Sequence, residues 1–202
     1  MRRNFSTVLI VLILAAGLAL LLYPSFSNFN NRRHQSEANE KYEEMLNTLD
    51  YEEFRALWDK AERYNELLYE SAMGRPVMSD ETFVYEELLS IAPRTQMSFI
   101  DIEKIDAHIA IWHGTDEGTL QNYIGHWEAS SLPVGGESTH CVLTGHTGLP
   151  SARLFTDLDK LVIGDVFTLI LFLERKSIKK NFIFARKGCN SKALRPVTKR
   201  SF

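Results

Sequence analysis

The most pronounced hydrophobic pattern in the chain lies in its first 31 residues. Arg2 and Arg3 precede a charge-free stretch from Asn4 to Asn31, whose centre, Thr7 to Tyr23, is 17 residues long and almost entirely apolar. A helix of this length roughly spans the hydrocarbon core of a bilayer. Because basic residues keep their end of such a helix in the cytoplasm, the rest of the chain is predicted to be extracytoplasmic.

A cleaved signal peptide is the alternative interpretation of this segment. The apolar run is longer than a usual signal-peptide core, and no A-x-A cleavage site follows it. Phe5, Tyr23 and Phe26 flank the run at positions where aromatic side chains reach the membrane interface. We therefore predict an uncleaved anchor over residues 1–24 and a single-pass cell-membrane protein with an extracytoplasmic domain.

A helical pattern follows the predicted anchor. Between Ser36 and Tyr69 the apolar residues recur at three- and four-residue spacing, while acidic residues occupy the other faces as solvated surface. Asp50 lies three residues before Glu53, a pattern typical of a helix N-cap and its partner in the first turn. We predict two amphipathic helices, or one helix with a break near Asp50. Residues 25–95 are assigned to a helical stalk and a lid-like linker, with one short helical turn around Tyr85–Leu89.

From Met97 onward the pattern becomes that of short β-strands. Eight of the 11 glycines fall between Gly114 and Gly164, so turns are frequent there. This texture predicts a mainly β barrel or sandwich rather than a βαβ fold. The expected elements are two strands joined near Asp106, a short helix over Asp116–Tyr123, a buried strand over His140–Thr144, an amphipathic turn over Leu154–Leu161 and a strand over Val166–Leu173.

The net charge of −3 conceals an uneven distribution. Residues 1–174 carry 13 Lys and Arg against all 26 Asp and Glu, whereas residues 175–202 carry 10 Lys and Arg and no acid. We therefore divide the rest of the chain into a β domain over residues 96–173 and a basic tail over residues 174–202 without a strand pattern. The hydrophobic content of 45% excludes a disordered chain, and two cysteines exclude a disulfide-rich scaffold.

His146 is the candidate catalytic residue. It follows the apolar segment HCVLT and is flanked by Gly145 and Gly148, so its side chain can project from the end of a strand toward a substrate. A purely structural histidine is the alternative. The six histidines show no metal-ligand spacing, and the sequence contains no GxSxG, P-loop or GxGxxG motif, so we predict no metal and no cofactor.

The segment Ile105–Phe167 resembles the N-terminal part of a class C sortase, the pilin-assembling type of Gram-positive bacteria. The resemblance rests on HWEASSLPVGG, from His126 to Gly136, and on TGHTGLPSARLFTDLDKL, and it extends more loosely over residues 1–168. It implies a sortase-type β-barrel and a cysteine transpeptidase that cleaves LPxTG-like sorting signals and joins pilin subunits or anchors surface proteins to the cell wall. The implied partners are proteins bearing these signals and the membrane, with no nucleic acid. By position, His146 matches the family's acid/base histidine.

The resemblance also has departures. The family nucleophile lies in a TLxTC strand after the histidine, followed by an arginine, and no cysteine or arginine of this chain matches them. Cys189 lies in RKGCNSK with Arg195 six residues later, and Cys141 is predicted to be a small buried residue. The stretch SDETF, from Ser79 to Phe83, lacks the Asp-Pro-aromatic triplet of the family lid.

These departures predict a sortase that is truncated or frameshifted after about residue 170 and inactive in this form, with a tail unrelated to the family pattern. The alternative is a non-catalytic membrane-anchored protein. Its basic tail would bind anionic wall polymer or lipid headgroups.

Overall fold

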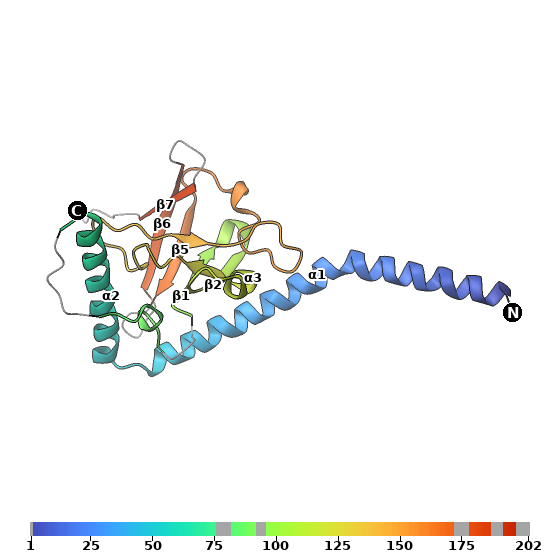
Figure 1. Ribbon diagram of the computed structural model, residues 1–202, viewed down its shortest axis with the longest axis horizontal. Helices are drawn as coiled ribbons and strands as arrows, with labels where there is room; N and C mark the ends of the chain where they lie inside the picture. Colours follow the sequence, from blue (N-terminus) through green and yellow to red (C-terminus); the bar gives the residue numbers. More distant parts are fainter. Residues whose placement is uncertain (1, 76–81, 92–95, 172–177, 187–191, 197–202) are drawn as a thin grey trace.

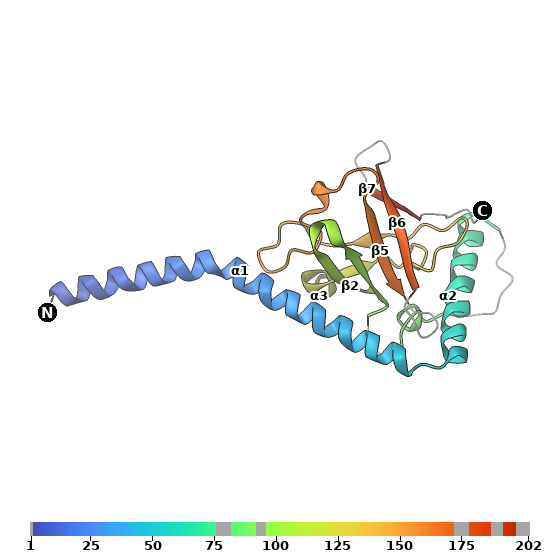
Figure 2. The same ribbon diagram turned by 180° about the vertical axis from the view of Figure 1, so that it is seen from behind.

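A long helix and a curled β-sheet make up the molecule. The computed structural model describes residues 2–75, 82–91, 96–171, 178–186 and 192–196. Helix α1 (Arg2–Thr48) projects far from the body at its N-terminal end, and its C-terminal half runs along the sheet (Figure 1; Figure 2). Among the described residues, α1 is the helix that is long and apolar enough to cross a membrane. The helix continues through Pro24, so no helix end marks the anchor boundary predicted at residue 24.

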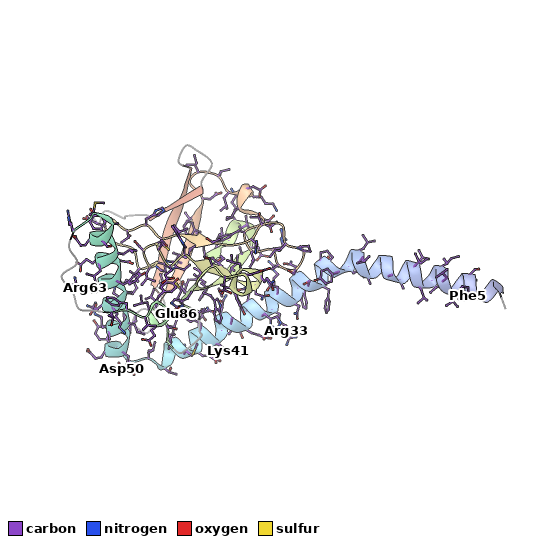
Figure 3. The ribbon with its side chains drawn as sticks, in the orientation of Figure 1. Phe5, Arg33, Lys41, Asp50, Arg63 and Glu86 are labelled. Carbon is purple, nitrogen blue, oxygen red and sulfur yellow. The ribbon has the colours of Figure 1, made fainter. Side chains whose placement is uncertain are left out.

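The chain turns sharply between α1 and α2 (Tyr51–Ala72). Asp50 lies at this junction (Figure 3) and forms a capping box with Glu53. The Glu53 backbone N–H donates to Asp50 Oδ1 at 2.8 Å, and the Asp50 N–H donates to Glu53 Oε2 at 3.2 Å. These bonds satisfy N–H groups that a helix start otherwise leaves without partners. The predicted break near Asp50 is confirmed.

Seven strands form a single sheet in the order β4-β3-β2-β1-β5-β6-β7. Their bounds are β1 Ser98–Ile102, β2 Ala107–His113, β3 Ile124–His126, β4 Leu143–Thr144, β5 Val166–Leu171, β6 Ile178–Arg186 and β7 Lys192–Pro196. The short helical elements are η1 Tyr85–Glu87, η2 Glu103–Ile105, α3 Glu117–Asn122 and η3 Leu158–Lys160. The short turns predicted near residues 85, 116 and 158 are therefore confirmed.

The predicted pair of strands around Asp106 is also confirmed. Strands β1 and β2 are antiparallel, with Ile100 opposite Ile109, and Asp106 adopts the left-handed conformation between them at φ 51°. Strand β3 then pairs with β2 in parallel, and α3 lies between them in the chain. The sheet therefore contains one β-α-β unit that the sequence analysis did not predict.

Two strand predictions need correction. The buried strand predicted over His140–Thr144 is only the two-residue β4, which is partly exposed because it pairs with β3 alone at the edge of the sheet. The tail predicted to lack strands contains β6 and β7. Strand β6 pairs with β5, with Phe182 opposite Phe167, because the backbone of β5 offers a free edge that the tail fills. Residues 174–177, 187–191 and 197–202 of the tail lie outside the described residues.

Both helices reach the sheet domain with buried polar side chains. Asn65 of α2 clamps Leu132: its Nδ2 donates to the Leu132 carbonyl at 3.1 Å, and the Leu132 N–H donates to Asn65 Oδ1 at 2.7 Å. From α1, Gln35 Oε1 accepts from the Ala110 N–H at 2.8 Å, and the hydroxyl of the fully buried Tyr42 donates to the Met97 carbonyl. These hydrogen bonds hold the two helices against the sheet domain.

Replacing Asn65 by Ala should lower the free energy of unfolding by about 2–4 kcal/mol, because it leaves both the N–H and the carbonyl of Leu132 buried without partners. The control is Asp59→Ala on the same helix, which removes an exposed ion pair with Arg55 and should change the stability by less than about 0.5 kcal/mol. Urea unfolding of the full chain in a mild detergent, followed by circular dichroism, measures both. Equal effects of the two substitutions would show that the clamp does not stabilise the fold.

Candidate functional site

His146 lies directly after β4, in a loop whose backbone is held at defined points. Its carbonyl accepts a hydrogen bond from the Phe155 N–H at 3.1 Å, and its side chain is exposed. Gly145 packs against the Phe155 ring so closely that an added Cβ would lie 2.8 Å from the ring atom Cδ2. Two residues after His146, the Gly148 N–H donates to Thr156 Oγ1 at 2.9 Å. The imidazole is therefore presented to solvent from a backbone fixed on both sides.

Cys141 has the opposite environment. It precedes β4 by two residues, and burial of the thiol raises its pKa to about 12. At neutral pH the group is therefore a protonated thiol, which is a poor nucleophile. Among the described residues, no hydrogen bond joins Cys141 to His146. The remaining candidates lie elsewhere: Cys189 is outside the described residues, and Arg195 belongs to β7, where it pairs opposite Ile183.

A buried polar cluster, not predicted from the sequence, lies behind this segment. At its centre is His126, the last residue of β3, whose side chain is fully buried. Its Nε2 lies 3.0 Å from the Ser131 carbonyl, and its Nδ1 lies 2.8 Å from the hydroxyl of Tyr85 in η1. The Tyr85 hydroxyl also accepts from the Gly114 N–H at 3.2 Å. We refer to Tyr85, His126, Ser130 and Ser131 as the His126 cluster.

The hydrogen bonds fix the protonation state of His126. A carbonyl oxygen only accepts, so Nε2 carries the hydrogen and donates to Ser131. In the neutral ring Nδ1 is then an acceptor, and the Tyr85 hydroxyl is shared between it and the His126 carbonyl, 3.0 Å away. Burial lowers the pKa of His126 to about 4, and burial raises the pKa of Tyr85 to well above its ordinary value. Both groups are therefore neutral at physiological pH.

The His126 cluster also holds the segment that leads to His146. The Ser130 hydroxyl accepts from the Val142 N–H at 3.0 Å, and the Ser131 hydroxyl accepts from the His140 N–H at 3.0 Å. The backbone adds a bond from Trp127 N–H to the Val142 carbonyl, also at 3.0 Å. The segment before β4 is therefore satisfied mainly by hydroxyl and loop groups rather than by a regular strand partner.

A cavity of about 660 Å³ lies between α1, the β1–β2 connection and residues 153–157. Its lining includes Arg32 and Arg153, which are ion-paired with Asp106 and Asp157 respectively. His146 does not line this cavity. Within the described part of the chain, no three His, Cys, Asp or Glu side chains are placed to hold a metal ion.

The low pKa of His126 predicts a loss of stability in acid. The unfolded chain takes up the proton near pH 6.5 and the folded chain only near pH 4, so the unfolded state binds more protons between these values. Between pH 7 and pH 4 the free energy of unfolding should fall by on the order of 3 kcal/mol through this group. Burial also lowers the pKa of His113, which acts in the same direction.

Urea unfolding at several pH values tests this prediction. His126→Gln keeps a donor near Ser131 but cannot titrate, so its stability should depend less on pH between 7 and 4 than that of the unaltered chain. His140→Gln, at an exposed histidine, is the control and should leave the pH dependence unchanged. The prediction fails if the pH dependence of His126→Gln equals that of the control.

Comparison with known proteins identifies the domain. A family profile described as the sortase domain matches residues 100–176. The crystal structure of sortase C1 from Streptococcus agalactiae is 35% identical, with a TM-score of 0.62 over 73% of this chain and 74% of that one. For the Streptococcus pneumoniae sortase C these values are 30%, 0.58, 73% and 72%, and for a lid mutant of Corynebacterium diphtheriae sortase A they are 31%, 0.54, 65% and 69%.

A comparison with curated protein sequences finds no significant match. The structural matches confirm the predicted mainly β sortase fold preceded by a long helix that could span a membrane. The sequence identity and the share of both chains that is aligned exceed what a common fold alone produces. The chain belongs to the sortase family.

Proposed function

We propose that this chain carries the site of the class C sortase reaction on LPxTG-like sorting signals of pilin or surface proteins, with His146 in the place of the acid/base residue, and that it binds these signals without completing the reaction. Family membership supports the reaction class. The observation that carries the role of His146 is its exposed side chain on a backbone held by Phe155. An imidazole in this setting can exchange protons with a bound peptide without a rearrangement of the fold.

The proposed reaction has two steps, and His146 serves in both. A cysteine thiolate attacks the Thr carbonyl of the signal, the Thr–Gly bond breaks, and the imidazolium gives its proton to the leaving Gly amine. A Lys amine of a second pilin then attacks the thioester, loses a proton to the imidazole, and the thiolate leaves as the new amide bond forms.

Cys141 does not fit the role of this nucleophile. Its raised pKa keeps the thiol protonated, the residue is half-buried, and within the described part of the chain no hydrogen bond joins it to His146. We therefore propose that Cys141 is a packing residue. We further propose that this 202-residue chain binds sorting signals without turning them over, because no cysteine or arginine of the chain matches the family nucleophile and its arginine.

The proposed location is the cell membrane, with α1 as a single-pass anchor and the sheet domain outside the cytoplasm. Two features support it. The residues from Thr7 to Tyr23 form an apolar, fully exposed stretch of α1, and the basic residues Arg2 and Arg3 lie at its outer end. Figure 3 shows Phe5 near this free end, far from the body.

A fluorogenic LPxTG peptide, incubated with the full chain in mild detergent, tests the function. We expect binding that exceeds that of a scrambled peptide at least about tenfold, which corresponds to roughly 1.4 kcal/mol, and no turnover. His146→Ala should leave binding within a factor of about three, as should the control His140→Ala at the other exposed histidine of this region. Equal binding of the two peptides would contradict the proposed function.

If turnover is observed, the variants Cys141→Ala and Cys189→Ala show which cysteine is the nucleophile. Turnover lost in Cys141→Ala would contradict the packing role of this residue. Turnover lost in Cys189→Ala would support a sortase reaction and contradict the proposal that this chain does not turn the signals over.

The state of the Cys141 thiol can be measured without a substrate. Alkylation of Cys141 by iodoacetamide at pH 7.5, followed by mass spectrometry, should be at least about a hundredfold slower in the folded chain than in urea, because so little thiolate forms when the pKa is about 12. Cys189 in the same sample provides an internal reference. Equal rates for Cys141 in the folded and unfolded chain would contradict the raised pKa.

A further inference from the structure

Two exposed aromatic side chains follow the apolar stretch of α1. Phe26 is 72% exposed and Phe29 is 68% exposed, although both belong to a helix that packs on the sheet domain a few residues later. The first charged residue after them is Arg32. Amphipathic aromatic rings lie at the level of the lipid headgroups, and Tyr23 ends the apolar stretch. The uncharged segment between Tyr23 and Arg32, which carries the exposed Phe26 and Phe29, therefore covers the headgroup level on α1.

The sheet domain makes its first contact with α1 at this same level. The Ser27 hydroxyl donates to the Ser151 carbonyl at 3.4 Å, and the Arg153 N–H donates to Asn28 Oδ1 at 3.2 Å. Both views show the loop between β4 and η3 beside α1 where the helix leaves the body (Figure 1; Figure 2). The loop that begins with His146 is thus the part of the domain that lies nearest to the apolar stretch.

Helix geometry gives the height of this contact above the hydrocarbon. Asn28 lies five residues beyond Tyr23, which is about 7.5 Å along a helix axis. The headgroup layer on each side of a bilayer is about 5–8 Å thick. Pro24 can tilt the apolar stretch relative to the domain. Because Pro24 precedes Phe26, Ser27 and Asn28, a bend at Pro24 moves these three residues together. Phe26 and the two contacts to the loop therefore stay at the same height above the hydrocarbon.

We propose that the membrane loop, residues 147–152, lies in the phospholipid headgroup layer of the bilayer that α1 spans. Its sequence TGLPSA carries no charge, and Thr147, Gly148 and Pro150 are exposed. An uncharged loop contacts headgroups without needing anionic lipid, so the contact should persist in zwitterionic vesicles and at high salt. His146, the residue before the loop, is then presented at the membrane surface.

Fluorescent labelling in vesicles tests the position of the loop. The full chain, with both native cysteines replaced by Ala, receives an environment-sensitive label at Thr147→Cys, and is inserted into phosphatidylcholine vesicles containing a headgroup spin-labelled lipid. Phe26→Cys is the positive reference. Glu137→Cys is the control, because this exposed residue lies in a groove beside α2, away from the exit of α1.

The labels at 147 and 26 should be quenched to a similar extent, by at least about twofold, and the label at 137 should not be quenched. Quenching at 26 without quenching at 147 would overturn the proposal. Absence of quenching at both positions would overturn it too, because α1 would then not place this level in the headgroups. Neither measurement requires peptide turnover, so a failed sorting reaction leaves this result intact.

Hydrogen exchange provides a second measurement on the unaltered chain, in case removal of Cys141 impairs folding. Amides of residues 147–152 should exchange several-fold more slowly in phosphatidylcholine nanodiscs than in detergent micelles, whereas those of residues 135–139 should not differ. Equal exchange of the membrane loop in both settings would overturn the proposal.

Discussion

Buried backbone groups of the sheet domain need hydrogen-bond partners, and the helices α1 and α2 supply some of them. Leu132 is fully buried in a loop, yet both of its backbone groups bond to Asn65 of α2. Gln35 of α1 serves the Ala110 N–H in the same way. A short sheet with irregular loops could not satisfy these groups by strand pairing alone. The helices are therefore structural parts of the sortase domain, and the position of α1 relative to the sheet follows from its polar contacts as much as from apolar packing.

The same requirement explains the His126 cluster. Strand β4 pairs over only two residues, so the residues before it have no strand partner. The hydroxyl groups of Ser130 and Ser131 accept from the N–H groups of Val142 and His140 instead. His126 in turn donates to the Ser131 carbonyl and accepts from Tyr85. The ring atom Nδ1 can accept from Tyr85 only while the imidazole is neutral, and burial keeps it so. The geometry that presents His146 thus depends on a residue that never reaches the substrate.

The sequence predicts those features whose partners are close along the chain. Asp50 and Glu53 indicate the capping box directly, because the two residues form both bonds between themselves. The sequence does not indicate the hydrogen bond between Tyr85 and His126, because these residues are 41 positions apart. It also does not indicate that the polar residue Asn65 lies on the same buried face of α2 as Phe54, Trp58 and Ala61. Strand β6 was missed for a different reason: lysines interrupt its apolar alternation, IKKNFIFAR, although its antiparallel partner β5 directly precedes it in the chain. Long-range pairing decides the contacts of Tyr85 and Asn65, and no local pattern reports it.

The placement of Cys141 and His146 limits how a reaction site can be assembled here. The two residues lie on either side of the two-residue strand β4, five positions apart. Their environments differ, since burial raises the pKa of the Cys141 thiol whereas His146 is exposed. A thiolate that works with His146 must therefore come from another element, one that approaches the exposed face beyond β4. Because β4 forms an edge of the sheet, that face is open to a partner strand or a substrate peptide.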